Sequence, residues 1–173
     1  YNNAYITIYR ANQLLFKKDD VADISDAEKT QLEAEARFLR ALCHHGILRL
    51  FAQPSGYTSD DSHLGIVLRM KYSQDAGLRS TVKECYEAIV DDLTFAEENL
   101  PANNGVYATK WSAKALLARV YLDQNKYSLA AEKASEVINS GQFTMLDSLT
   151  RFTAGANTEQ IFATVSYNQN NIS

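Results

Sequence analysis

The sequence predicts an all-α protein of stacked helix pairs, with one long loop and a short terminal strand. Over most of the 173 residues, apolar side chains recur at three- and four-residue steps, the period of a helix with a buried face. Only two prolines and seven glycines interrupt the chain, which favours long helices. Ser25 and Thr81 each stand three residues before a glutamate, the spacing of a capping box at a helix start.

The composition narrows the class of protein. Hydrophobic residues at 46% and charged residues at 22% are ordinary values for a globular domain. A net charge of -4, without a cluster of Lys and Arg, argues against a nucleic-acid partner. No apolar run approaches the roughly 20 residues that span a bilayer. Because a helical pattern begins with the first residues, we expect 1–173 to be a single helical domain cut from a longer chain.

The first two predicted helices are long and amphipathic. Apolar residues between Tyr5 and Phe16 mark the first helix, and a polar stretch at 17–24 follows it. The capping box at Ser25 starts the second helix, which should run to about Phe51. We expect this second helix to lie between neighbours because it carries two apolar stripes. One stripe holds Leu32, Ala36, Leu39, Cys43, Ile47 and Leu50, and the other holds Phe38, Ala41, Leu42, His45 and Leu48.

Cys43, His44 and His45 stand side by side in the second helix and raise the question of a metal or catalytic site. Consecutive helical residues point roughly 100° apart, so three in a row cannot converge on one ion or one substrate atom. The residues three and four positions away supply no further metal ligand. We interpret Cys43 as a core residue, His44 as a solvated side chain and His45 as half-buried. The polar side of the helix carries Glu33, Arg37, Arg40 and His44.

Residues 53–80 form a long connection after the second helix, with a short strand expected at 64–68. Connections beyond roughly 15 residues are uncommon unless they bind a ligand or lack fixed structure. An aromatic ring near carboxylates can stack on a ligand and hold its polar groups. We therefore predict ligand binding in the first half of the connection, the alternative being a surface loop without direct ligand contact. The predicted ligand-binding residues are Tyr57, Asp60, Asp61 and His63.

Three further helices are predicted downstream. The capping box at Thr81 starts a helix that ends before Pro101, and Thr109 caps the next one. A turn at 123–126 leads into the last helix, which a Ser-Gly pair at 140–141 should end.

Two remaining features carry no evident chemistry. Asp91 and Asp92 are adjacent on the third helix and diverge around its axis, whereas paired carboxylates for acid–base work must face one cleft. We interpret them as a solvated face from which one carboxylate bonds a neighbouring element. Residues 161–165 predict a terminal strand without an obvious partner, a further sign that the chain belongs to a longer one.

Residues 114–138, KALLARVYLDQNKYSLAAEKASEVI, resemble a tetratricopeptide repeat. Small residues in that motif let two antiparallel helices cross closely. The positions that fall at its spacing are Leu117, Ala118, Tyr121, Tyr127 and Ala130.

Five longer segments follow one another along the chain: IYRANQLL, AEARFLRALCHHGILRLFAQP, STVKECYEAIVDDLTFAEENLP, ATKWSAKALLARVYL and NTEQIFATVSYN. Their sequences and order resemble the SusD/RagB family of outer-membrane nutrient-binding lipoproteins. The resemblance implies a helical scaffold that docks on a TonB-dependent transporter as a lid and captures oligosaccharides or peptides without cleaving them. It also implies a lipid anchor at the cell surface in the full-length protein. The lipidated cysteine and the loop-rich second half of the family lie outside this sequence, so no individual ligand contact is carried over.

Three classes of function are compatible with a helical chain of this kind. The first is nutrient capture, and the second is a generic tetratricopeptide-type scaffold for a protein or peptide partner, which the repeat supports. The third is an all-helical enzyme, for which the sequence offers no nucleophile–base pair, phosphate loop or metal spacing. We therefore predict a binding protein without catalytic residues, metal or cofactor, and leave both a glycan and a peptide open as its ligand.

Overall fold

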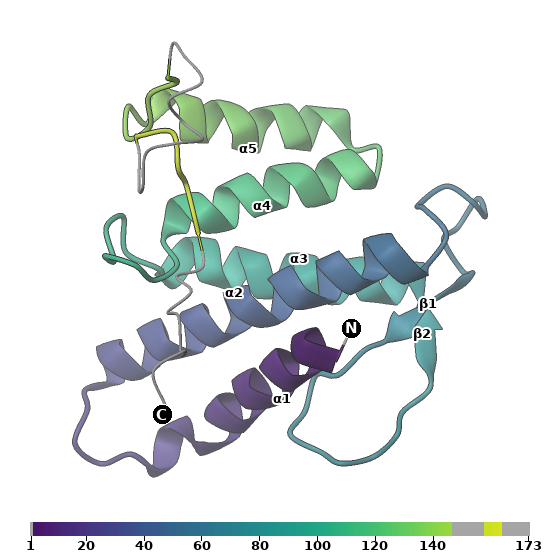
Figure 1. Cartoon of the computed structure of the whole chain (residues 1–173), viewed down its shortest axis with the longest axis horizontal. Coiled ribbons are helices and arrows are strands. Elements are labelled where there is room, and N and C mark those ends of the chain that lie inside the picture. Colours follow the sequence, from purple (N-terminus) through teal and green to yellow (C-terminus); the bar gives the residue numbers. More distant parts are fainter. Residues whose placement is uncertain (1, 147–157, 164–173) are drawn as a thin grey trace, which may run out of the picture.

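The computed structural model describes residues 2–146 and 158–163, and helices make up most of it (Figure 1). Each of the five predicted helices is present, which confirms the all-α class. In chain order the described elements are α1 (Asn2–Lys17), the short 3-10 helix η1 (Lys18–Asp20), α2 (Asp26–Phe51), β1 (Leu64–Val67), β2 (Arg79–Thr81), α3 (Val82–Asn99), α4 (Lys110–Asp123) and α5 (Tyr127–Asn139).

Side-chain caps begin three of these helices, as predicted. At α2, Ser25 Oγ accepts a hydrogen bond from the Glu28 amide at 3.3 Å, and Glu28 Oε2 accepts one from the Ser25 amide at 2.8 Å. Thr81 forms the same capping box at α3, and Thr109 caps α4. Each cap satisfies amide groups that have no partner within the helix, which stabilises a helix start by about 1 kcal/mol.

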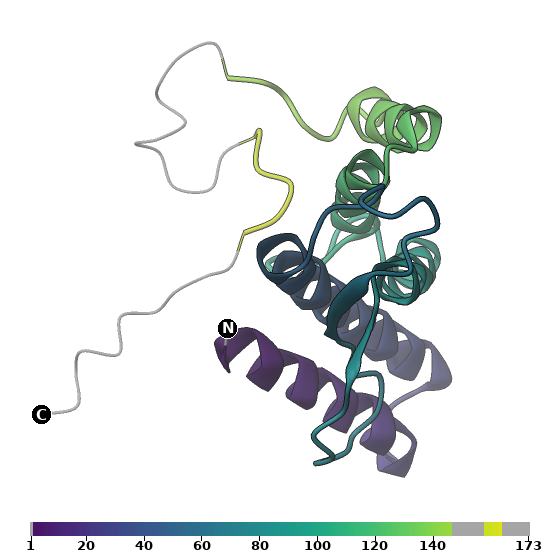
Figure 2. The same cartoon turned by 90° about the vertical axis from the view of Figure 1, so that its right-hand side faces the viewer.

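The helices stack in chain order. Helix α2 packs between α1 and α3, α4 packs on α3, and α5 packs on α4 at the upper edge of Figure 1. Helices α4 and α5 run antiparallel and are joined by a tight turn in which Asn125 has a φ of 59°. This is the helix pair that the tetratricopeptide resemblance predicts. Figure 2 views the stack from the side where α2 ends and α3 begins, and shows that the chain between these two helices lies on that side. None of the described helices is both long and apolar enough to cross a membrane.

The core lies between α1, α2, α3 and α4. The α2 stripe that includes Phe38 and Leu48 is buried, as predicted. The other stripe is buried at Ile47 but not throughout, since Leu39 is 36% exposed and Leu50 is 77% exposed. The prediction is wrong at these positions because the described residues cover α2 mainly from α1 and α3. The largest fully buried apolar side chains are Ile8, Phe38, Ile89, Leu93 and Leu117.

The connection between α2 and α3 contains two short strands that pair antiparallel. Strand β1 lies where a strand was predicted, and Leu64 pairs with Thr81 of β2. Sequence reasoning missed β2 because its three residues, Arg-Ser-Thr, carry no apolar alternation. Gly65 lets β1 lie close to α3, since a Cβ at this position would be 2.8 Å from Cys85 Sγ.

The predicted terminal strand at 161–165 is not present at 161–163, and residues 164–165 lie outside the described residues. Phe162 instead packs edge-on against Phe38 of α2, with ring centroids 5.1 Å apart and ring planes at 76°. The apolar character of this segment therefore serves packing on a helix.

Candidate functional site

The predicted site residues lie in the loop between α2 and β1, which folds into consecutive turns. The amide of Tyr57 donates to the carbonyl of Pro54 at 3.2 Å, and the amide of Asp61 donates to that of Thr58 at 3.2 Å. Gly56 and Asp61 adopt positive φ angles of 86° and 56°. Glycine reaches this region at no steric cost and aspartate tolerates it better than most residues, so the sequence allows these turns.

Asp61 and His63 hold this loop together from within. Asp61 accepts hydrogen bonds from the hydroxyl of Ser55 at 2.6 Å and from the backbone amide of Gly56 at 2.7 Å. His63 Nδ1 lies 2.9 Å from Thr58 Oγ1, and its Nε2 lies 3.2 Å from the carbonyl oxygen of Gln53. Both carboxylate oxygens and both ring nitrogens are thus engaged inside the loop, and these two side chains set its shape.

Tyr57 and Asp60 are open to solvent. The Tyr57 side chain is 64% exposed, and its ring meets the His63 ring at a centroid distance of 5.3 Å and an angle of 62°. Asp60 Oδ1 accepts a hydrogen bond from the Ser62 amide at 3.1 Å. Hydrogen bonds from Ser62 lower the pKa of the Asp60 carboxyl, so this group is charged at neutral pH. The loop therefore presents one oriented aromatic ring and one carboxylate.

The four predicted residues do not line one cavity. Tyr57 and His63 line a hollow of about 680 Å³ at the end of α2, called here the Tyr57 hollow. Asp60 and Asp61 line a second hollow of about 610 Å³, called here the acidic hollow. The other charged residues that line the acidic hollow are Lys83, Glu87, Asp91 and Lys126.

The Tyr57 hollow has the surface that suits a sugar ring. Phe51 is 53% exposed, so two aromatic rings line the same hollow. Arg79 is fixed beside them, because its Nε donates to the Gly65 carbonyl at 2.7 Å and its Nη2 donates to the Leu64 carbonyl at 3.1 Å. Aromatic faces can pack on the C–H groups of a sugar while a guanidinium offers donors to its hydroxyls.

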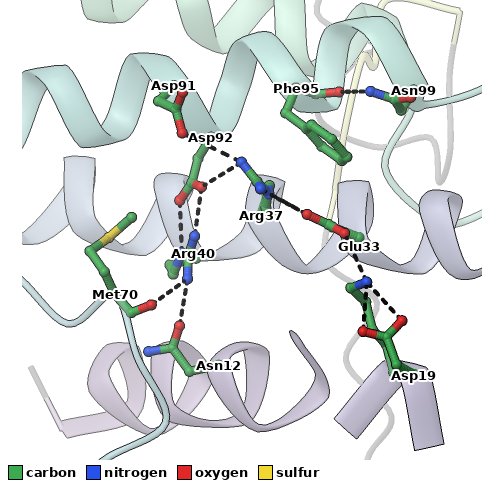
Figure 3. A network of polar contacts seen from close by, with 11 residues as sticks. Asn12, Asp19, Glu33, Arg37, Arg40, Met70, Asp91, Asp92, Phe95 and Asn99 are labelled. Atoms are coloured by element: carbon green, nitrogen blue, oxygen red, sulfur yellow. Dashed lines mark hydrogen bonds and ion pairs between the residues drawn. The ribbon is translucent and has the colours of Figure 1, made fainter. Parts of the chain in front are cut away.

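A buried polar network was missed by sequence reasoning (Figure 3). Arg40 of α2 is 5% exposed and donates two hydrogen bonds to the fully buried Asp92 of α3, with Nε–Oδ2 at 2.8 Å and Nη2–Oδ1 at 2.7 Å. Its Nη1 donates to Asn12 Oδ1 on α1 at 2.6 Å and to the Met70 carbonyl at 3.1 Å. The expectation that one of the acidic pair bonds a neighbouring element is confirmed. The expectation that both carboxylates form a solvated face is wrong for Asp92.

The same network fixes segment 67–71, which comprises the last residue of β1 and the irregular chain after it. Asn12 Nδ2 donates to the carbonyls of Arg69 at 3.0 Å and Lys71 at 3.2 Å, and the Tyr5 hydroxyl donates to that of Val67 at 2.9 Å. Side chains thus replace the pairing that a sheet would give this backbone. The signal that could have found the network is Asn12 itself, a polar residue on the apolar face of its helix.

His44 was predicted to be solvated, and this is wrong. It is 1% exposed, and its Nε2 accepts a hydrogen bond from the Arg69 amide at 3.2 Å. Burial, followed by the charge of Arg40, lowers the pKa of His44 to about 3, so the ring is neutral at physiological pH. His45 is buried rather than half-buried, with its Nε2 2.8 Å from Asp123 Oδ2 of α4. Segment 67–71 and α4 cover positions that the helix pattern alone left open.

Cys43 is partly buried beside the core, and burial raises the pKa of its thiol. The described residues contain no group of three Cys, His, Asp or Glu side chains that could hold a metal ion. Cys43, His44 and His45 therefore meet separate surroundings.

Known proteins share this fold and sequence. A SusD-like family model, described as starch-binding associating with outer membrane, matches residues 1–122. SusD-like protein P2 from Formosa agariphila is 32% identical over 139 residues, which cover 79% of this chain and 26% of that relative. A solved SusD superfamily protein from Bacteroides thetaiotaomicron has a TM-score of 0.76 at 33% identity, covering 84% of this chain and 33% of its own. A solved laminarin binding SusD-like protein has a TM-score of 0.71 at 26% identity, covering 88% of this chain and 33% of its own.

This chain spans 27% and 26% of the length of two curated relatives that it matches. The family match runs from α1 through nearly all of α4 and includes the loop of Tyr57. The helix order, the sequence match and the superposition agree, and the chain belongs to the SusD-like family.

Proposed function

We propose that the protein to which this chain belongs captures oligosaccharides at the outer membrane and passes them on uncleaved. Membership in a family described as starch-binding supports the ligand class, as does similarity to a laminarin binding protein. The observation that carries the proposal is the Tyr57 hollow, where two exposed aromatic rings lie beside a fixed arginine.

In this proposal Tyr57 is the main contact, and His63 orients its ring from the side. The aromatic face packs on a sugar ring, and Arg79 donates to hydroxyl groups at the edge of the hollow. Asp60 and Asp61 lie on the other side of the loop, so only a ligand that follows the loop would reach them. The proposed contacts are stacking and hydrogen bonds, and the site binds the oligosaccharide without cleaving it.

The proposal extends to the surroundings of the protein. Residues 1–173 form one helical domain of a longer, lipid-anchored chain that works with a TonB-dependent transporter at the cell surface. The support for these statements is membership in a family described as associating with the outer membrane, together with relatives roughly three times as long.

The experiment is titration calorimetry of the full-length protein against glucan oligosaccharides and peptides, with chromatography of each ligand afterwards. We expect a glycan to bind and to be recovered intact. Tyr57→Ala should weaken binding by about 1 kcal/mol, roughly fivefold, through loss of one stacking partner. Tyr107→Ala is the matched control, since that tyrosine is 63% exposed in the loop before α4 and should not matter. Shortened ligand would overturn the proposal in favour of an enzyme.

A peptide-binding scaffold is the second candidate. Helix α5 packs on α4 and reaches α3 through the ion pair between Lys133 and Glu97, and it exposes Tyr127 by 62% and Ile138 by 74%. Peptide binding that is unaffected by Tyr57→Ala but lost on substitution of Ile138 would favour this candidate.

A further inference from the structure

A third hollow lies between α1 and residues 67–76, separate from the loop of Tyr57. Its volume is about 610 Å³, and the segment that bounds it loops beside α1 in Figure 1. We call it the tyrosine groove, after Tyr5 and Tyr9 of α1, which form one wall. Residues 67–76 form the facing wall. The lining residues that matter here are Tyr5, Tyr9, Val67, Arg69, Lys71 and Gln74.

The far wall of the tyrosine groove is fixed by buried contacts. The carbonyls of Arg69 and Lys71 accept hydrogen bonds from Asn12, which is 3% exposed, and the amide of Arg69 donates to the buried His44. Arg40 holds the carbonyl of Met70 between them. A binding site whose backbone is already ordered loses less conformational freedom when a ligand enters. The two cationic residues therefore start from positions that are set by the core.

An aromatic surface borders the groove along α1. The Tyr9 side chain is 37% exposed, its hydroxyl donates to that of Tyr72 at 3.1 Å, and the two ring centroids are 5.0 Å apart. Phe16, 69% exposed, continues this surface with its ring centroid 5.6 Å from that of Tyr72. Such a row of partly exposed rings offers an apolar surface on which sugar rings can pack.

The charge of the tyrosine groove is opposite to that of the acidic hollow. Among the residues that the structure describes, Arg69 and Lys71 line the groove and no carboxylate does, whereas four carboxylates and two lysines line the acidic hollow. Neither cation forms an ion pair with any of the described residues. The Arg69 guanidinium donates to the backbone carbonyls of Asp75 and Ala76, and the Asp75 carboxylate is turned to the Ser73 hydroxyl at 2.7 Å. Two positive charges beside aromatic faces are therefore available to an anion.

We propose that the tyrosine groove binds an acidic oligosaccharide, with its sugar rings on Tyr9 and its carboxylate or sulfate groups at Lys71 and Arg69. The choice of a glycan rests on the proposed function, while the need for negative charge rests on the groove alone. Starch and laminarin, the glycans named for the family and for a similar structure, are neutral, so this groove would add a ligand class to theirs.

The test uses the full-length protein and two pairs of matched probes. One pair is oligogalacturonate and its methyl ester, and the other is a sulfated galactan oligosaccharide and its desulfated form. Titration calorimetry should show that at least one acidic probe binds about fivefold or more tightly than its uncharged form. Because the interaction is ionic and exposed, its affinity should fall as salt is added.

Variants locate the binding. Lys71 is exposed, so Lys71→Met should leave the fold intact and lower the affinity for the acidic probe by about two- to fivefold. Lys71→Arg keeps the charge and should retain binding. Lys83→Met is the control, because it removes the same charge from the acidic hollow and should leave the affinity unchanged. An equal effect of Lys71→Met and Lys83→Met would overturn the assignment to this groove.

The remaining outcomes separate this inference from the proposed function. Equal affinity for a charged probe and its uncharged match would overturn the inference. Binding of neutral glucans that depends on Tyr57, without binding of either acidic probe, would refute the inference and leave the proposed function standing. Failure of every glycan to bind would refute both. Binding of the acidic probes through Lys71, with no neutral glucan bound, would support the inference and remove the Tyr57 hollow from the proposed function.

Discussion

The contact between Arg40 and Asp92 offers the sharpest test of how this fold holds its irregular segment. In Asp92→Ala, the guanidinium of Arg40 would remain buried without the two carboxylate oxygens that now lie 2.8 and 2.7 Å away. Asn12 and the Met70 carbonyl would still accept from Nη1, so the loss falls on Nε and Nη2. Removing one partner of a buried ion pair costs about 3–5 kcal/mol, because the other charge stays desolvated. This is a large share of the roughly 5–15 kcal/mol that stabilises a typical domain.

The assay is urea unfolding followed by far-ultraviolet circular dichroism, which reports the helices. Asp91→Ala is the matched control, since its side chain is 75% exposed and 3.4 Å from Arg37. We expect that control to change the free energy of unfolding by less than about 0.5 kcal/mol. Equal destabilisation by Asp91→Ala and Asp92→Ala would refute the reasoning.

A double variant tests the physical cause. Arg40→Met with Asp92→Leu removes both charges and leaves only the neutral acceptors of Asn12 and Met70 without Arg40, at about 1–3 kcal/mol each. The double variant should therefore lose less stability than the sum of Arg40→Met and Asp92→Leu alone, because each single substitution leaves one buried charge unpaired and the double variant leaves none. Hydrogen exchange should also be faster for segment 67–71 in Asp92→Ala, because Arg40 keeps its contact with the Met70 carbonyl but loses the carboxylate that fixes its own position. Additive losses from the two single substitutions would mean that buried charge is not the cause.

Two further predictions concern His44 and the helix pair. Folding lowers the pKa of His44 from 6.5 to about 3, so only the unfolded chain takes up this proton between those values. The free energy of unfolding should consequently fall as the pH falls below 6.5, by up to about 1.4 kcal/mol per pH unit from this residue. His44→Gln keeps an acceptor for the Arg69 amide and should remove that contribution. The measurement is urea unfolding of both proteins from neutral to mildly acidic pH. The same dependence of the free energy of unfolding on pH in the variant and in the parent would contradict the assignment. In the α4–α5 pair, Ala118→Leu and Ala130→Leu should each overpack the crossing and destabilise by about 1–3 kcal/mol. Ala131→Leu, on the exposed side of α5, is the control and should leave the melting temperature unchanged. Unchanged melting temperatures in the Ala118 and Ala130 variants as well would show that neither alanine lies at a close contact.

The candidate site was predicted only in part from sequence. The loop after α2 was identified from its length and from its aromatic and acidic residues, and Tyr57 is exposed there. The division of the four residues between two hollows arises in a loop of consecutive turns, in which Gly56 and Asp61 adopt positive φ angles. A sequence permits such angles without requiring them, because they are stabilised by contacts such as that of Asp61 with Ser55.

The sequence by itself determined where the helices begin and end. The caps at Ser25, Thr81 and Thr109 involve residues three apart, and the apolar period acts over a few turns, so both are encoded locally. Only the tertiary structure decided which polar residues are buried. Arg40 and His44 lie on a side of α2 that looks solvated in isolation, and it is covered by a backbone segment some 25 to 30 positions further along the chain. Whether a helix face meets water or another part of the chain depends on packing between distant segments, and helical periodicity carries no information about that packing.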